Sequence, residues 1–322
     1  MSSPEAYRPG LHRYAVVVAC ATGVLLFVGG LVTSTGSALS VPDWPLSYGK
    51  VFPAMTGGVL FEHGHRMAAA TVGLLTIVLT LWLWRAEPRR WVRWLGMAAL
   101  AAVVLQGVLG GVTVLLRLPV AVSVAHAGLA EIFFCLTVTI ALVTSARWLE
   151  GPTSSPIPDA GRPTLRTLTR VTIAVVYLQV LAGALVRHTG AGLAIPDFPL
   201  AFGGLWPAPA LMSNLVVYQL VHRAGALLVA AMVLWTAGAT LRRHSAVVEL
   251  RRTAALLLVL LAFQVYLGAA IIWTRRAVIP TTAHVLSGAL VLATSLVLAL
   301  RVTRLLAPLP TDRTSTAASA AA

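Results

Sequence analysis

Charged residues are scarce in this chain, because only 11% of its 322 residues are Asp, Glu, Lys or Arg. A soluble domain usually carries about 25% charged residues, so the composition excludes an ordinary water-soluble domain. Cysteine is scarcer, with Cys20 and Cys135 alone, both inside apolar runs. This scarcity excludes a disulfide framework and a cysteine-rich zinc site, and both cysteines are expected to be small buried residues.

Long apolar runs dominate instead. A helix needs roughly 20 apolar residues to cross about 30 Å of hydrocarbon, and eight runs meet that length. We therefore predict an all-α integral membrane protein with eight transmembrane helices. The predicted spans are residues 13–33, 64–84, 92–115, 120–146, 167–187, 215–240, 252–273 and 280–301.

The formal net charge of +14 comes from arginines that flank the apolar runs. This pattern is typical of a membrane protein's basic margin rather than of a nucleic-acid-binding surface. Alternate sides of the predicted spans carry 17 and 7 of the 24 Lys and Arg residues. The excess predicts a multi-pass protein of the cell membrane with both termini in the cytoplasm and the long loops 34–63 and 188–214 outside.

An internal repeat divides the chain into two units of four spans. The segment Gly29–Gly49 aligns without a gap with Gly183–Gly203, and three shorter matches follow in the same order. Four spans are an even number, so both units enter the membrane in the same direction. We expect two tandem four-helix bundles related by a pseudo-two-fold axis along the membrane normal. The predicted domains are residues 1–148 and 165–305, joined by a polar linker at 149–164 and followed by a disordered tail at 306–322.

Four of the eight histidines obey the repeat. His65 aligns with His222 and His126 with His284, and the two histidines of a unit are 61 or 62 residues apart. All four are predicted near the outer ends of the second, fourth, sixth and eighth spans. Two imidazoles across a helical bundle suit the axial ligation of a haem iron. The alternative interpretation is an interfacial histidine bonded to water or to a carbonyl group.

The residues near these histidines support a flat anionic ligand. Small residues would let a macrocycle approach the backbone, namely Gly107, Gly110, Gly111 and Gly268. Arg66 and Arg223 directly follow a histidine and could neutralise haem propionates near the interface. The remaining histidines have no partner in the repeat. His12 and His244 lie beside arginines on the predicted cytoplasmic side and are expected to have no special role, whereas His63 and His188 are expected to be loop residues.

The two units differ in their acidic residues. Glu62 precedes His65 by about one helical turn and aligns with Gln219, while Glu131 in the fourth span aligns with Ala289. A carboxylate can relay protons and an amide cannot. We therefore expect the first unit to carry the chemistry and the second to hold a haem for electron transfer. Two plainer interpretations stay open: Glu62 pairs with Arg66, and Glu131 faces Arg117 or another polar group.

The outer loops carry the repeated units Pro42–Leu46 and Pro196–Leu200, in which prolines flank Trp44 and Phe198. Rigid loops of this kind suggest ordered caps over the two haem sites. An interfacial aromatic belt is the alternative explanation.

The segments TSTGSALSVPDWPLSYG and EHGHR, together with the four histidines, resemble the haem A synthase family. The similarity covers about residues 12–302. It implies an oxidoreductase that converts the C8 methyl group of haem O into a formyl group through a hydroxymethyl intermediate. The resemblance also places the substrate near His65 and His126. It places a haem b cofactor between His222 and His284. Glu62 matches the family's essential glutamate and is the expected catalytic residue.

The resemblance implies partners as well: a membrane-bound haem O synthase as supplier and an electron donor. Nucleic acid is not expected, lipid surrounds the bundles, and a homo-oligomer is compatible with them. Many relatives carry a cysteine pair in the first outer loop, but residues 34–63 contain none, which leaves the electron path open. The main alternative is a quinol-linked dihaem b-type electron carrier, which explains four histidines but not acids in one unit only. A transporter with parallel repeats fits less well, because its polar groups usually lie near the midplane.

Overall fold

The computed structural model describes residues 7–151 and 157–307. Within them, eight helices are long and apolar enough to cross a membrane, which confirms the all-α fold and the predicted spans. These helices are α1 (Pro9–Ser34), α2 (Gly58–Ala86), α3 (Arg90–Leu115), α4 (Val120–Val143), α6 (Leu165–His188), α7 (Asn214–Arg243), α8 (Val248–Trp273) and α9 (Val278–Leu305). Most begin or end a few residues beyond the predicted bounds, while the fourth ends at Val143 instead of residue 146.

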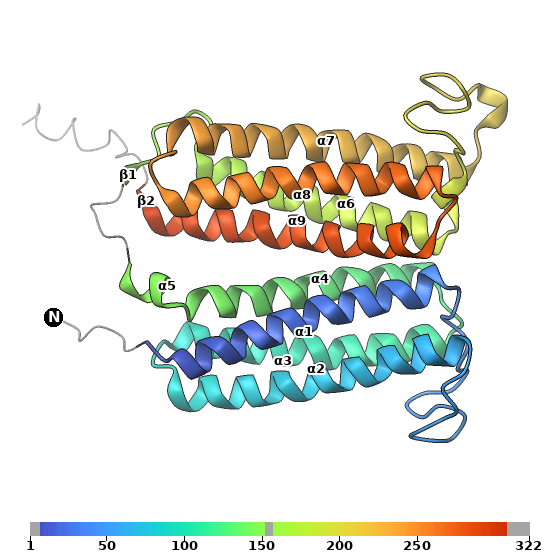
Figure 1. Cartoon of the computed structure of the whole chain (residues 1–322), viewed down its shortest axis with the longest axis horizontal. Helices are drawn as coiled ribbons and strands as arrows, with labels where there is room; N and C mark the ends of the chain where they lie inside the picture. The colour runs from blue at the N-terminus through green and yellow to red at the C-terminus, as the bar shows by residue number, and fades with distance from the viewer. Residues whose placement is uncertain (1–6, 152–156, 308–322) are drawn as a thin grey trace, which may run out of the picture.

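The helices pack as two four-helix units side by side (Figure 1). The N-terminal unit contains α1–α4 and the C-terminal unit contains α6–α9, each with its own buried apolar cluster. Between the units, α1 contacts α9, α4 contacts α6, and α4 contacts α9. This exchange of partners is what a two-fold relation between equivalent helices produces.

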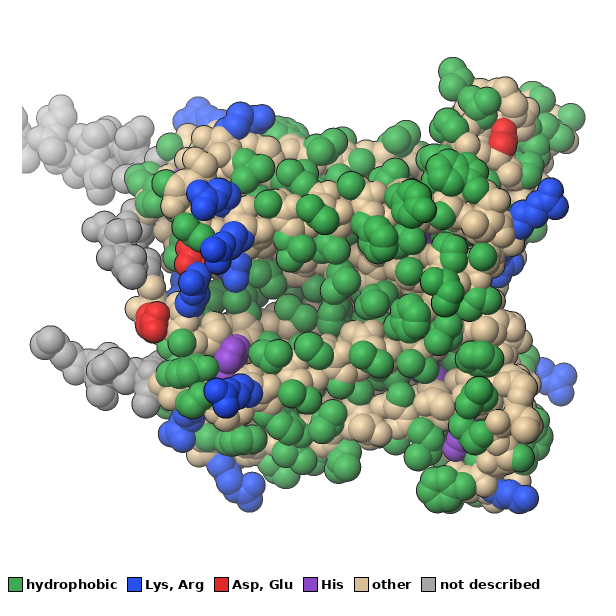
Figure 2. Space-filling view, viewed as in Figure 1, with side chains coloured by type: hydrophobic (Ala, Val, Ile, Leu, Met, Phe, Trp, Pro, Cys, Tyr) green, Lys and Arg blue, Asp and Glu red, His purple; other side chains and the backbone are tan. Residues whose placement is uncertain are grey.

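Apolar side chains cover the outside of both units between their two ends (Figure 2). In each of these helices, no more than half of an 18-residue apolar stretch is buried inside the protein. In water such a surface would drive aggregation, whereas lipid solvates it. The fold is therefore that of a multi-pass membrane protein.

The two ends of the molecule differ in charge and structure. Both long loops, residues 35–57 and 189–213, lie at one end, called here the loop end (right in Figure 1). The second loop includes the short 3-10 helices η1 (Ala191–Leu193) and η2 (Pro209–Leu211). The opposite end, called the linker end, carries the start of α1 and most of the Lys and Arg side chains visible in Figure 2.

The polar linker predicted at residues 149–164 contains regular structure in its described part. Helix α5 (Ala146–Glu150) extends into it, and strand β1 (Ile157–Pro158) pairs in parallel with β2 (Leu306–Ala307). Asp159 then accepts hydrogen bonds from the backbone N–H groups of Leu165 and Arg166 at 2.9 and 3.1 Å. The segment therefore docks on the C-terminal unit and starts α6. Of the predicted tail, residues 306–307 form β2, and residues 308–322 lie outside the described part.

The two cysteines are free, as expected. The prediction that both are buried is wrong for Cys20, which is exposed on α1, while Cys135 on α4 is partly buried. Because apolar helices in lipid can present a small thiol outward, hydropathy alone does not identify the buried face.

Candidate functional site

The four repeated histidines lie near the N-terminal ends of their helices, which is the loop end of the molecule. They are His65 on α2, His126 on α4, His222 on α7 and His284 on α9. Within each unit the two histidines lie on different helices of one bundle, near the same end of the molecule; that each pair holds one haem stays a prediction. The expected arrangement of two equivalent sites, one for each unit, therefore has a structural counterpart.

Each of these imidazoles packs against a glycine of the neighbouring helix. A Cβ atom built on that glycine would lie 3.0–3.3 Å from the Cε1 atom of the ring. The pairs are Gly29 with His65, Gly183 with His222, Gly110 with His126, and Gly268 with His284. A larger residue would push the ring away by a few tenths of an ångström, so these glycines allow the close packing of the four imidazoles. Gly110 and Gly268 were expected beside the sites, whereas Gly107 has open space around it.

Three of these imidazole rings lie within hydrogen-bonding distance of a glutamine side chain. The sequence analysis assigned no role to these glutamines. Gln106 Nε2 lies 3.2 Å from His126 Nε2, and Gln264 Nε2 lies 3.4 Å from His284 Nε2. Both glutamines occur in the aligned segments of the repeat, so the repeat contained a signal for them. They are in position to orient the imidazoles before a ligand binds.

The third glutamine has no equivalent in the other unit. Gln179 Nε2 lies 2.9 Å from His222 Nδ1 and donates to the His222 carbonyl oxygen at 2.8 Å. The repeat places Leu25 at this position in the N-terminal unit, and His65 Nδ1 is buried with no hydrogen-bond partner in the described part of the chain. His222 is therefore held more firmly than His65.

The donor set fits a haem better than a bare metal ion. Among residues 7–151 and 157–307, no group of three or more His, Cys, Asp or Glu side chains could hold a metal ion. A haem brings its own ring nitrogens and needs only two axial ligands. Three buried imidazole nitrogens have no hydrogen-bond partner in the described part of the chain and are free to accept a ligand, namely Nδ1 of His65, His126 and His284. Two imidazoles and two ring-contacting glycines in each unit therefore suit a planar iron porphyrin.

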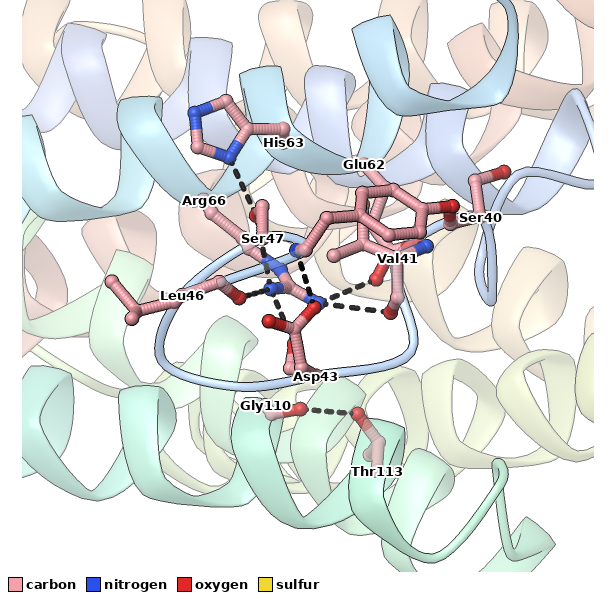
Figure 3. A network of polar contacts seen from close by, with 11 residues as sticks. Ser40, Val41, Asp43, Leu46, Ser47, Glu62, His63, Arg66, Gly110 and Thr113 are labelled. Atoms are coloured by element: carbon pink, nitrogen blue, oxygen red, sulfur yellow. Dashed lines mark hydrogen bonds and ion pairs between the residues drawn. The ribbon is translucent and has the colours of Figure 1, made fainter. Parts of the chain in front are cut away.

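Glu62 and Arg66 fasten the first outer loop to α2 (Figure 3). The buried carboxylate of Glu62 accepts from the Val41 backbone N–H at 2.8 Å and forms an ion pair with Arg66 at 2.8 Å. Arg66 also donates to the carbonyl oxygens of Asp43 and Leu46 at 2.7 and 2.8 Å. The ion pair that the sequence left as a plainer interpretation is thus present. The propionate role of Arg66 stays a prediction.

The C-terminal unit repeats this anchor with an amide in place of the acid. Gln219 Oε1 accepts from the Ile195 backbone N–H at 2.5 Å, and Arg223 donates to the carbonyl oxygens of Asp197 and Leu200 at 2.6 and 2.8 Å. Val41 and Ile195 are equivalent in the repeat. The two units therefore share one loop geometry and differ in whether the anchoring side chain can carry a charge.

Both outer loops are ordered over their units. Trp44 packs so closely on Gly111 of α3 that a Cβ there would lie 2.5 Å from the indole. In the C-terminal unit the equivalent residue is Ala269, and the smaller Phe198 stacks edge-on against Trp273 with ring centroids 6.2 Å apart. Because Gly111 adjoins Gly110, which contacts His126, the first loop lies next to the imidazole site.

Glu131 lies on α4, buried, and its Oε2 atom has no hydrogen-bond partner in the part of the chain that the structure describes. No ion pair joins it to Arg117 within that part. Its repeat partner Ala289 belongs to a small apolar cluster with Phe134. Glu131 is therefore a buried acid whose Oε2 atom no described polar side chain satisfies.

The other histidines have structural positions. The prediction of His63 as a loop residue is wrong: it is buried within α2, where Nδ1 lies 2.8 Å from Ser47 Oγ of the loop. His188 is the last residue of α6 rather than part of a loop. His12 contacts Thr144 at the linker end, and His244 ends α7 there.

Comparison with known proteins places this geometry in a family context. Residues 55–296 match the COX15-CtaA family of cytochrome oxidase assembly proteins. A haem A synthase of Symbiobacterium thermophilum is 37% identical over 265 residues, which cover 79% of this chain and 84% of the relative. Haem A synthases of Shouchella clausii and Bacillus licheniformis are 29% and 28% identical over 83% and 82% of the chain, and 88% and 87% of their own lengths.

Proposed function

The chain belongs to the COX15-CtaA family of cytochrome oxidase assembly proteins, and we propose that its two units divide haem A synthesis between a substrate site and an electron-transfer site. Haem O binds in the N-terminal unit between His65 and His126. A resident haem b binds in the C-terminal unit between His222 and His284. The extra hydrogen bond that Gln179 gives His222 supports this assignment, since a permanent ligand benefits from a fixed imidazole and an exchanging one does not.

The reaction is that of a haem A synthase, in which a methyl group becomes a hydroxymethyl and then a formyl group. The first oxidation removes two electrons and two protons from the methyl group and one water molecule together, and the oxygen of that water becomes the hydroxyl group. The second removes two electrons and two protons from the hydroxymethyl group. When bound, haem b supplies reversible one-electron transfer. The protein's own residues orient the porphyrin through paired imidazoles, admit it beside glycines, and exclude water with the loop that Trp44 seals against α3.

Glu62 is the residue that we assign to proton handling. The observation that carries this assignment is its equivalence to Gln219. Both side chains accept a hydrogen bond from the equivalent backbone N–H group of their loop, yet only Glu62 can hold or release a proton at its Oε atoms. It lies about one turn closer to the loop end than His65, beside the substrate site. A carboxylate there can also stabilise positive charge that develops on the substrate.

The topology follows from the arginines. The linker end, where they gather (Figure 2), faces the cytoplasm, so both termini are cytoplasmic and the haem sites lie toward the outer face of the cell membrane. The two units are related by an approximate two-fold axis along the membrane normal, which the reciprocal contacts of α1 with α9 and of α4 with α6 support.

Two partners complete the proposal. A membrane-bound haem O synthase delivers the substrate, because haem O is apolar enough to stay in lipid. An electron donor or acceptor exchanges electrons with haem b without help from loop cysteines, which residues 35–57 do not contain.

The test is the haem content of cells that express the chain together with a haem O synthase, measured by extraction and mass analysis. Haem A or its hydroxymethyl precursor, absent from an empty-vector control, is the expected result. Haem b and unreacted haem O alone, from folded protein with a low-spin spectrum, would support a dihaem electron carrier instead.

A further inference from the structure

Arg187 crosses the boundary between the two units. It is the penultimate residue of α6 in the C-terminal unit, and its Nη2 donates to Thr33 Oγ1 of α1 in the N-terminal unit at 2.5 Å. The gapless alignment of Gly29 with Gly183 makes Thr33 the repeat equivalent of Arg187. The same position of both units therefore meets at the interface, but only one copy contributes a cation.

Within residues 7–151 and 157–307, no ion pair gives this guanidinium group a counter-charge. Its Nε atom is inaccessible to solvent and has no hydrogen-bond partner in the described chain. The ion pairs found among the described residues join other arginines to Glu62, Glu87 and Glu249. Arg276 lies near enough for its positive charge to act on Arg187. Arg187 is only partly exposed, and a charge that is withdrawn from water is costly unless it is paired, so this position favours an anion.

The charge faces the N-terminal site. Arg187 interacts electrostatically with His65 and His126, whereas His222 interacts with Arg223. Thr33, which accepts the hydrogen bond from Arg187, lies four residues beyond Gly29, which contacts the His65 ring. At about 1.5 Å per residue, the α1 backbone at Thr33 is roughly 6 Å nearer the loop end than at Gly29, so Arg187 reaches α1 just above the level of the His65 imidazole.

We propose that Arg187 of the C-terminal unit binds a carboxylate of the porphyrin held in the N-terminal unit. The proposal rests on the proposed function, because it takes the porphyrin to be the substrate haem. A planar guanidinium group can bind a carboxylate through two parallel hydrogen bonds. Arg66, the candidate that the sequence offered for this task, instead uses donors on the carbonyl groups of its own loop. The first site is thus completed by the second unit.

The test compares two ligands that differ only in their carboxylates. Purified full-length protein, with its C-terminal site filled, is titrated with haem b and with haem b dimethyl ester. The N-terminal site is recognised as the absorbance change that His65→Ala abolishes. Arg187→Gln should weaken haem b binding at this site roughly 10- to 100-fold, the range expected for a lost hydrogen bond to a charged group. Binding of the ester should be the same in the variant and the wild type.

Two further variants separate charge from structure. Arg187→Lys keeps the cation and should lose less affinity than Arg187→Gln. The exchange Arg187→Thr with Thr33→Arg returns a cation to the other copy of the same position and should restore part of the preference for the free acid. Arg275→Gln, which removes an exposed arginine at the same end, is the matched control and should bind both ligands as the wild type does.

An equal loss of acid and ester binding in Arg187→Gln would show that Arg187 only holds the units together, and would overturn the proposal. Unchanged affinity for haem b would overturn it as well. Either result is distinguishable from failure of the proposed function, which would appear in the wild-type chain as an absence of haem A and of a second bound haem.

Discussion

The carboxylate of Glu62 accepts a hydrogen bond from the backbone N–H of Val41 at 2.8 Å, which ties the catalytic candidate directly to the loop above its site. The same carboxylate pairs with Arg66. A substitution at Glu62 therefore has two consequences, one for the loop and one for the chemistry. The C-terminal unit shows how to separate them, because its Gln219 holds the equivalent loop without a charge.

Glu62→Gln should keep the first loop anchored, leave haem binding in both units intact, and lower haem A formation by about 10²- to 10⁴-fold, the usual contribution of general acid–base catalysis. Haem A yield in the co-expression assay measures the effect. The matched control is Gln219→Glu, which should leave the yield unchanged. A normal yield from Glu62→Gln would remove Glu62 from the chemistry and leave it as a loop anchor.

His222→Ala should remove the low-spin b-type haem spectrum of the purified protein, because it deletes one of the two axial ligands that we propose for the C-terminal unit. The visible spectrum of the reduced protein is the measurement. His12→Ala removes an imidazole at the linker end and should leave the spectrum unchanged. An unaltered spectrum in His222→Ala would mean that the resident haem binds elsewhere.

Gly111→Ala should displace Trp44 and loosen the first loop, since the added methyl group would lie 2.5 Å from the indole. Overpacking of this kind typically costs about 1–3 kcal/mol. Faster tryptic cleavage at Lys50, which is exposed in the loop, measures the loosening. Gly107→Ala on the same helix meets nothing within 4 Å and should be cleaved at the wild-type rate. Equal rates for the two variants would show that Trp44 does not hold the loop.

The first loop should also loosen in acid. Backbone N–H groups of Gly49 and Tyr48 donate to Asp43, at 2.8 and 2.7 Å, and hold the pKa of Asp43 below its usual value of 3.8. A lowered pKa in the folded state means that the stabilisation is complete above pH 3.8 and is lost as the pH falls through the lowered value. Hydrogen exchange at the Gly49 amide, corrected for its intrinsic pH dependence, should therefore stay protected down to about pH 4.

Asp43→Asn is the companion variant, because the neutral amide has one acceptor oxygen where the carboxylate has two. Protection of the Gly49 amide should already be reduced at neutral pH in this variant and should change little in acid. A variant that keeps the wild-type acid profile would show that another group controls the loop.

Much of this architecture could be read from the chain alone. The eight spans follow from the length and composition of apolar runs, which are local properties, and the structure has all eight. The repeat identified His65, His126, His222 and His284, since duplicated units preserve the order and spacing of their residues. The contrast between Glu62 and Gln219 was equally visible in the alignment.

The contacts around these residues could not be read in the same way. Gln179 had no repeat signal because its counterpart is Leu25, and Arg187 was hidden because its counterpart is Thr33. The sequence predicted a polar linker but not that Asp159 and strand β1 dock it on the C-terminal unit. Each of these features depends on segments that meet only after the helices pack.

The sequence by itself thus determined the membrane-spanning helices, their duplication and the four imidazoles, because hydropathy and repetition are written along the chain. The tertiary structure alone decided which side chains contact those imidazoles and that Arg187 donates a hydrogen bond to Thr33 of the other unit. The physical reason is that helices apolar all round carry little information about their rotation, so contacts such as that between Thr33 and Arg187, 154 residues apart, are fixed by packing.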